Sequence, residues 1–194
     1  MKLSTVFTRL TPNTKNWNKP SGKVGKCLAV NTSNRLYEEL NQFGWEEWLF
    51  EDYNAGNKTC LGFLQAFNNK NNHVTSVEII HLYTRVCDRK KAKQFYVGYI
   101  KDVKVLHENQ RIVSEKQKMQ RLADLNAVNI NFSSADSMWN KCFNIQFEMK
   151  NVVFHDNFLK KEIQLNRGQF RFSLYDLKDL KHTNINQEIN KLNH

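Results

Sequence analysis

Asp136, Glu148 and Lys150 have the residue types and the spacing of a metal-dependent nuclease site. In such nucleases the carboxylates bind Mg²⁺, and a lysine two positions after the second carboxylate helps to orient the attacking water. Glu148 and Lys150 fall on the polar side of an expected strand, where contacts across the sheet also explain an acid and a base. Because short patterns of this kind arise by chance in charged chains, we keep a nuclease as an alternative and expect no catalytic residue.

The other titratable residues form no recognisable catalytic or metal-binding motif. The six histidines are dispersed without zinc spacing, and the chain has no Gly-rich phosphate loop, no GxSxG and no HNH-like pairing. The four cysteines, Cys27, Cys60, Cys87 and Cys142, are far apart and predict neither a zinc site nor a disulfide framework. No apolar run approaches the roughly 18 residues of a membrane span. We therefore expect no metal, no cofactor, no membrane partner and a reduced, cytoplasmic protein.

Trp45, Trp48 and Tyr53 are the candidate base-binding rings, because this aromatic stretch lies beside a glycine and several asparagines, where a loop is expected. Stacking on one ring is worth roughly 1–3 kcal/mol per base, so two rings could hold a base that has left the DNA stack. Trp48 is followed by two large apolar residues, which favour packing in the core instead. If alanine variants of all three rings stay folded and still discriminate modified from unmodified DNA, the pocket lies elsewhere, and Tyr83, Tyr96 and Trp139 are the next rings to test.

Asn31 and Ser33 are the candidates for hydrogen bonds to the edge of such a base. They leave an expected strand just before the helix that leads to the aromatic stretch. Short polar residues at such places are more often helix caps or turn formers. Both interpretations stay open for these two residues.

The charge of the chain favours a polyanionic partner. The formal net charge is +10, and seven basic residues precede the first acidic residue, after which six acidic residues follow without a base between Leu36 and Asn57. We interpret the basic segment as facing phosphates and much of the acidic stretch as facing away, although both could simply be solvated. The candidate phosphate-binding residues are Lys23, Lys26, Arg85, Arg89, Lys90, Lys91 and Lys93.

The expected elements describe an α+β domain over residues 24–177. A basic, loop-like arm at residues 1–23, anchored at Trp17, precedes it, and a polar tail at residues 178–194 follows it. Apolar alternation predicts strands over 24–31, 61–67, 74–84, 95–106, 143–154 and 168–174, and helices are predicted over 35–40 and 108–128. Gly98 should permit a bend or a close backbone approach. These elements predict one strongly curved mixed sheet, or a small β-barrel, with flanking helices.

Five segments in fixed order carry a family resemblance: Phe43-Gly44-Trp45-Glu46-Glu47-Trp48-Leu49-Phe50, Gly62-Phe63-Leu64-Gln65, Phe95-Tyr96-Val97-Gly98-Tyr99-Ile100-Lys101-Asp102-Val103, Phe143-Asn144-Ile145-Gln146-Phe147 and Arg171-Phe172-Ser173-Leu174-Tyr175-Asp176-Leu177. Over about residues 24–177 this set resembles the N-terminal domain that precedes HNH nuclease domains in modification-dependent restriction enzymes. The chain is also similar to the PUA-like superfamily, which includes the EVE, YTH, ASCH and SRA domains.

The resemblance implies a reader of modified DNA that takes the modified base into an aromatic pocket. It also implies double-stranded DNA as the partner and an HNH nuclease domain or subunit as a second candidate partner. The pattern departs from the HNH-linked domains because nothing after Asp176 could form a nuclease domain, so we expect an excised or standalone reader. An RNA-binding or protein-interaction module remains a further alternative.

Overall fold

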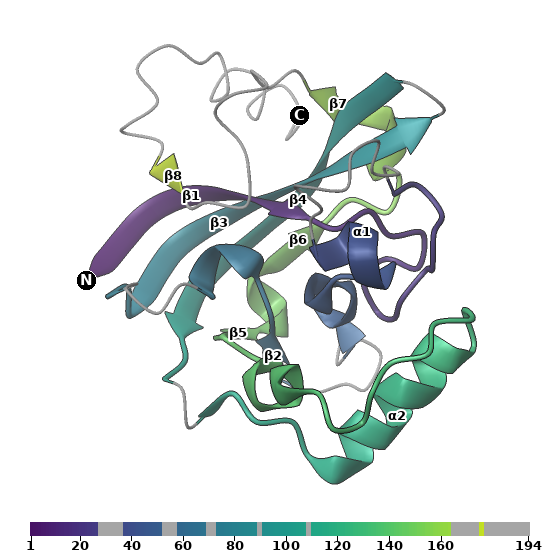
Figure 1. Ribbon diagram of the computed structural model, residues 1–194. Helices are drawn as coiled ribbons and strands as arrows, with labels where there is room; N and C mark the ends of the chain where they lie inside the picture. The colour runs from purple at the N-terminus through teal and green to yellow at the C-terminus, as the bar shows by residue number, and fades with distance from the viewer. Residues whose placement is uncertain are drawn as a thin grey trace.

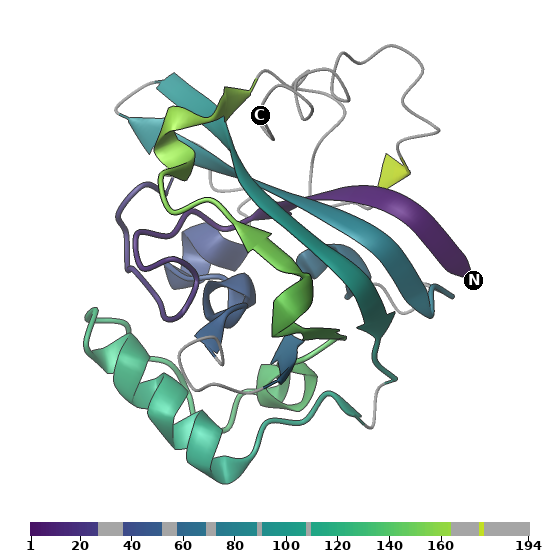
Figure 2. The same ribbon diagram turned by 180° about the vertical axis from the view of Figure 1, so that it is seen from behind.

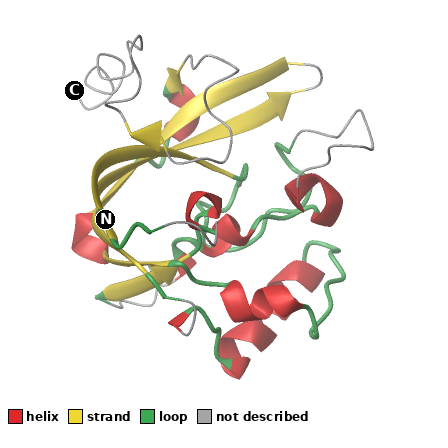
Figure 3. Cartoon of the chain, turned by 60° about the vertical axis from the view of Figure 1, so that its left-hand side comes forward, coloured by secondary structure: helices red, strands yellow, loops and turns green. Residues whose placement is uncertain are grey.

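The computed structural model describes residues 1–26, 37–51, 58–68, 73–88, 91–107, 110–163 and 175–176. This part of the chain has an α+β fold around one mixed sheet, whose strand order is β2-β5-β4-β3-β1-β8 (Figure 1). Two further strands, β6 and β7, also pair with β4. The long strands bend together into a curved surface (Figure 3). Within the described residues the end strands β2 and β8 do not pair, so the sheet is open and a barrel is not shown.

The sheet is built from strands β1 (Lys2–Leu10), β2 (Thr59–Gly62), β3 (Ser76–Asp88), β4 (Lys91–Val105), β5 (Ile145–Glu148), β6 (Val152–Phe154), β7 (Glu162–Ile163) and β8 (Tyr175–Asp176). The α-helices are α1 (Tyr37–Asn41) and α2 (Glu115–Asn126). The 3-10 helices are η2 (Trp45–Trp48), η4 (Gln65–Phe67), η6 (Ser137–Lys141), η7 (Met149–Asn151) and η8 (Phe158–Lys160). The predictions of β3, β4 and α2 are therefore confirmed with shifted ends. The single strand predicted over 143–154 is wrong, because η7 divides this segment into β5 and β6, and the strand predicted over 61–67 ends at Gly62 and is followed by η4. The expected strand over 168–174 and most of the one over 24–31 lie outside the described residues.

Strand β1 corrects the prediction of a loop-like N-terminal arm. Lys2–Leu10 pairs in parallel with β3, from Lys2 opposite Ser76 to Leu10 opposite Thr84. Val6 and Leu10 are fully buried in the core under the sheet. The run Thr-Val-Phe-Thr is rich in strand-forming residues, and the proline that suggested a loop comes only after the strand has ended. The irregular part of the arm is thus confined to the segment after Leu10.

Strands β3 and β4 form the long antiparallel hairpin at the centre of the sheet. Leu82 is opposite Gly98 but Tyr83 is opposite Tyr96, so Val97 is an extra residue on β4, which makes a β-bulge. Gly98 has φ +146°, and a Cβ on it would lie 2.0 Å from the carbonyl oxygen of Val153 in β6. The close backbone approach predicted at Gly98 is confirmed.

Two groups of buried apolar side chains stabilise the described fold. The first, the sheet core, lies on one face of β1, β3 and β4 and includes Leu10, Ile80 and Val97. The second, the aromatic cluster, joins η2 and η6 to α2 and includes Trp45, Trp48, Phe43, Phe63, Phe143, Trp139 and Leu125. The segments around the aromatic cluster have little regular secondary structure. The burial of these aromatic rings therefore provides much of the free energy that stabilises them.

The cysteines differ in their covalent state. Cys87, near the end of β3, is disulfide-bonded, whereas Cys60 and Cys142 are free and buried. The expectation that the chain contains no disulfide is wrong at Cys87, because the spacing of cysteines in the sequence does not show which of them lie close together in the fold. Disulfides persist mainly in oxidising compartments, so this bond does not favour a reduced setting. In the part of the chain that the structure describes, each helix is too short or too polar to cross a membrane.

Candidate nucleic-acid interface

Trp45 and Trp48 lie in the helix η2 and not in a loop, which corrects the expected local structure. Only 2% and 1% of their surfaces are exposed. The ring of Trp45 packs edge-on against Trp139 at 5.0 Å between ring centres, and its Nε1 donates to the Tyr37 hydroxyl at 3.1 Å. Trp48 Nε1 donates to Asp124 Oδ2 at 3.1 Å. In this arrangement a base could reach either ring only by displacing protein neighbours, and base binding by these rings stays a prediction.

Arg121 closes the aromatic cluster on the side of α2. Its guanidinium carbon lies 4.9 Å from the ring centre of Trp48 and 4.8 Å from that of Phe143. Two nitrogens of Arg121 donate to the carboxylate of Glu51, at 3.0 and 2.5 Å. A buried arginine is tolerated only when it is paired in this way. Trp48 is therefore fixed by a hydrogen bond from its Nε1 and by the guanidinium group stacked on its ring.

Three of the candidate base-binding residues, Asn31, Ser33 and Tyr53, lie outside the described residues.

The segment after β1, residues 11–26, is fixed to the rest of the protein and is called the anchored loop below. The expected anchor at Trp17 is confirmed, because this ring is fully buried and its Nε1 donates to the carbonyl of Thr11 at 2.8 Å. The carbonyl of Trp17 accepts from the amide of Phe50 at 2.9 Å. The side chain of Asn13 accepts from the amide of Trp17 at 3.0 Å. The loop thus has a defined shape although it lacks regular structure.

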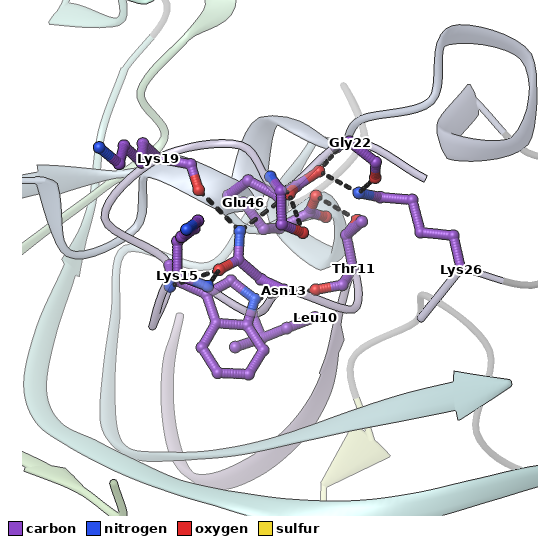
Figure 4. A network of polar contacts seen from close by, with 12 residues as sticks. Leu10, Thr11, Asn13, Lys15, Lys19, Gly22, Lys26 and Glu46 are labelled. Atoms are coloured by element: carbon purple, nitrogen blue, oxygen red, sulfur yellow. Dashed lines mark hydrogen bonds and ion pairs between the residues drawn. The ribbon is translucent and has the colours of Figure 1, made fainter. Parts of the chain in front are cut away.

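Two buried glutamates of η2 hold the anchored loop (Figure 4). Glu47 accepts from the side chain of Asn13 at 2.8 Å and from the amide of Ser21 at 2.9 Å. Its other oxygen lies 2.9 Å from the ammonium nitrogen of Lys26, which also donates to the carbonyl of Gly22. Burial raises the pKa of Glu47, and the charge of Lys26 opposes that rise. Glu46 accepts from the Thr11 hydroxyl at 3.1 Å.

This network corrects the expected separation of basic and acidic segments. Glu46 and Glu47 belong to the acidic stretch, yet they face the basic segment and bind it. Lys26 was expected to contact phosphate, but its side chain is only 5% exposed and its ammonium group pairs with Glu47. Its ammonium group is used inside the protein, because a buried cation must be paired.

Three lysines of the anchored loop remain exposed: Lys15, Lys19 and Lys23. The far end of the loop reaches the β3–β4 hairpin, where the amide of Cys87 donates to the carbonyl of Gly25 at 2.9 Å. In this hairpin Arg85 of β3 is half-buried and Lys93 of β4 is exposed. Arg85 is opposite Gln94 and Lys93 is opposite Val86, so the two basic side chains lie on opposite faces of the sheet. We call Arg85, Lys91 and Lys93 the basic end of the sheet, because all three lie in β3 and β4 near the turn that joins these strands.

Lys93 is also paired with Glu162 at 2.8 Å, in an exposed ion pair. Of the remaining phosphate-binding candidates, Lys91 begins β4 opposite Asp88, and Arg89 and Lys90 lie outside the described residues. Because an exposed ion pair of this kind contributes little to stability, Lys93 can exchange its carboxylate partner for a phosphate.

The three residues of the nuclease alternative make separate contacts with other parts of the protein. Lys150 pairs with Glu148 at 2.6 Å on the surface, whereas Asp136 caps η6 by accepting from the amide of Met138 at 2.8 Å. Among the described residues, no three histidine, cysteine or acidic side chains gather in a way that could hold a metal ion. The pattern that suggested a nuclease therefore has structural explanations at each of its positions.

The outer face of the sheet, opposite the sheet core, carries a cluster that the sequence analysis found only in part. Tyr83 and Tyr96, the alternative rings, lie there with His81, whose Nδ1 is 2.8 Å from the Tyr96 hydroxyl oxygen. Burial lowers the pKa of His81 to about 4 and raises the pKa of Tyr96. Simple alternation could not place Tyr96 and Tyr99 together, because the bulge at Val97 changes which face each position of β4 occupies.

Comparison of the chain with protein-family models, with curated proteins and with solved structures found no match. The functional argument therefore depends on the chemistry of the described side chains.

Proposed function

We propose that the protein is a DNA-binding reader: it binds double-stranded DNA and recognises a modified base, as the specificity module of a modification-dependent restriction system. The observation that supports DNA binding most directly is a set of exposed lysines: Lys15, Lys19 and Lys23 on the anchored loop, and Lys93 in the β3–β4 hairpin that this loop contacts. A net charge of +10 adds a general attraction to polyanions. The finer assignment to a PUA-like fold, and a cytoplasmic location, belong to the same proposal.

The anchored loop supports this function through its fixed shape. Lys15, Lys19 and Lys23 are presented by a segment that Trp17 and Glu47 hold at several points. A loop that is already ordered loses little conformational entropy on binding, so more of the attraction to phosphate is retained as affinity. Each phosphate that a lysine neutralises releases counterions, which makes the affinity strongly dependent on salt.

Recognition of a modified base would add specificity to this attraction. Extruding a base costs a few kcal/mol, and stacking on one aromatic ring returns roughly 1–3 kcal/mol. The described chain offers two groups of rings for this purpose, the aromatic cluster with Trp45 and Trp48 and the outer-face cluster with His81 and Tyr96. Cleavage would be supplied by an HNH nuclease domain or subunit acting with the reader.

The test is a binding series with matched duplexes that carry cytosine, 5-methylcytosine, 5-hydroxymethylcytosine or N6-methyladenine. We expect one modified duplex to bind more tightly than the others, and a duplex RNA competitor to bind more weakly. Equal affinity for all DNA duplexes would refute the reader and leave nucleic-acid binding standing. Preference for RNA would favour the RNA-binding alternative.

The same assay tests the two lysines of the basic end, together with their sequence neighbour Lys90, through the dependence of affinity on salt. Changing Lys90, Lys91 and Lys93 together to glutamine should reduce the slope of log affinity against log salt by about 2–3, because each phosphate contact contributes about 0.9. The matched control changes three exposed lysines elsewhere, Lys58, Lys104 and Lys116, and so alters the net charge equally. Equal effects of both triple variants would show that the basic end is not the contact surface.

A further inference from the structure

The outer-face cluster brings two histidines and four other rings into contact, and Tyr83 joins it through Phe7, with 5.5 Å between their ring centres. His81 stacks on Phe7 with 5.5 Å between ring centres and 24° between the planes, and Tyr99 meets it edge-on at 5.9 Å. Tyr96 contacts both histidines, with its ring centre 5.9 Å from His81 and 5.6 Å from His155. Four elements of the chain, β1, β3, β4 and the residue after β6, thus contribute to one group of rings.

The bulge and Gly98 are the features that assemble this cluster. The extra residue Val97 turns towards the sheet core, so Tyr96 and Tyr99 lie on the same face as His81. Gly98 lets β6 approach β4, and the amide of His155 then donates to the carbonyl of Val97 at 2.9 Å (Figure 2). Bulges occur often beside functional sites, because they redirect side chains out of the regular alternation.

One polar atom of the cluster lacks a hydrogen-bond partner. Nε2 of His155 is buried and has no hydrogen-bond partner, and such an atom normally costs free energy unless a ligand or water pairs with it. His81 is almost buried, with 8% of its surface exposed, while Tyr99 and His155 are half-buried. Tyr99 and His155 are therefore the two members of the cluster that reach the surface in part, while Nε2 of His155 itself lies below it.

The protonation of the two histidines defines the chemistry that the cluster offers. Burial lowers the pKa of both rings, and the positive charge of Lys161 lowers that of His155 further. At neutral pH both imidazoles are uncharged, and an uncharged imidazole has one nitrogen that donates and one that accepts. A planar ligand edge with a donor next to an acceptor complements such groups, and nucleobases have edges of this kind.

Positive charges lie beside the rings of the cluster. The ammonium group of Lys101 is 5.4 Å from the ring centre of Tyr99, and Lys161 is close enough to His155 to lower its pKa. Lys101 is exposed on the surface of β4. An uncharged ring site with lysines at its margin suits an uncharged base attached to a phosphate.

We infer that the outer-face cluster is the base-binding site, in which a nucleobase of a bound DNA strand stacks on Tyr99 and is hydrogen-bonded by His155. His81 and Tyr96 support these two residues by fixing the rings behind them. This inference rests on the proposed DNA binding and moves the base site from Trp45 and Trp48 to the other face of the sheet.

The test uses the complete chain and the four duplexes already named, with imidazole NMR signals of His81 and His155 as the direct measurement. Adding the preferred modified duplex should shift both imidazole signals, and the unmodified duplex should shift them less. Tyr99→Ala and His155→Ala should each reduce affinity for the modified duplex about ten- to hundred-fold, with little change for unmodified DNA. His107→Ala is the matched control, because His107 is an exposed histidine outside the cluster.

The outcomes separate this inference from the proposed function. If duplexes bind and discriminate but the imidazole signals do not move, the base site lies elsewhere and only this inference fails. If Tyr99→Ala and His155→Ala weaken all duplexes in proportion to lost folded protein, measured by circular dichroism, the cluster is structural and the inference also fails. If no duplex binds, the proposed function and the base site fail together.

Discussion

Removing the carboxylate of Glu47 should destabilise the protein strongly, because that group is fully buried and serves several donors. In Glu47→Ala, the ammonium of Lys26 stays buried without its partner at 2.9 Å, and the amide of Ser21 loses its acceptor. Removing one member of a buried ion pair typically costs about 3–5 kcal/mol, since the other charge remains desolvated. That loss is a large part of the roughly 5–15 kcal/mol by which a domain is stable.

The free energy of unfolding is measured by urea denaturation, followed by tryptophan fluorescence and circular dichroism. Glu148→Ala is the matched control, because Glu148 is paired with Lys150 on the surface and its removal should leave the unfolding midpoint nearly unchanged. The double variant Lys26→Met with Glu47→Gln should lose less free energy of unfolding than the sum of the losses in the two single variants, since it buries no unpaired charge. A loss below about 1 kcal/mol for Glu47→Ala would refute the buried pair as the anchor of the loop.

Two further predictions concern the outer face of the sheet. Because burial lowers the pKa of His81 from 6.5 to about 4, the unfolded chain binds the proton first as the pH falls; stability should be complete above about pH 6.5 and decline by roughly 3 kcal/mol towards pH 4. His81→Gln should flatten this decline in urea denaturation across that range, whereas a decline as steep as in the wild type would show that His81 does not cause it. Gly98→Ala should lower the melting temperature, because its Cβ would lie 2.0 Å from the Val153 carbonyl oxygen and φ +146° is unfavourable for alanine. A melting temperature equal to that of the wild type would contradict the close approach of β6.

The regular elements could be predicted where the sequence pattern is long and uninterrupted. The alternation in β3 and β4 extends over many residues, and α2 is capped at its N-terminus by Ser114, whose side chain accepts from the amide of Gln117. Strand β1 was missed because the prolines and asparagines behind it gave the whole segment the composition of a loop. Short 3-10 helices such as η2 have too few residues for any periodicity to be recognised.

The candidate site could be predicted in composition but not in position. Aromatic density around Trp45 and Trp48 was evident from the sequence, yet their burial depends on Trp139, Arg121 and Phe143, which are far away along the chain. The ring cluster at His81 depends on one extra residue in β4 and on a glycine that admits β6. Secondary-structure propensities depend on neighbouring residues in the sequence, so they do not predict such long-range contacts.

The run of bases followed by a run of acids has a structural explanation that also changes how the charge is interpreted. Glu46 and Glu47 bind Thr11, Asn13, Ser21 and Lys26, so charged and polar groups of the two runs complement each other in the interior. The sum of charges therefore says less about a partner than the identity of the lysines left outside. Lys15, Lys19 and Lys23 remain exposed because Glu47 fixes the loop that carries them. It follows that the affinity for a polyanion should fall in Glu47→Gln, a change inside the protein, as well as when the exposed lysines themselves are changed.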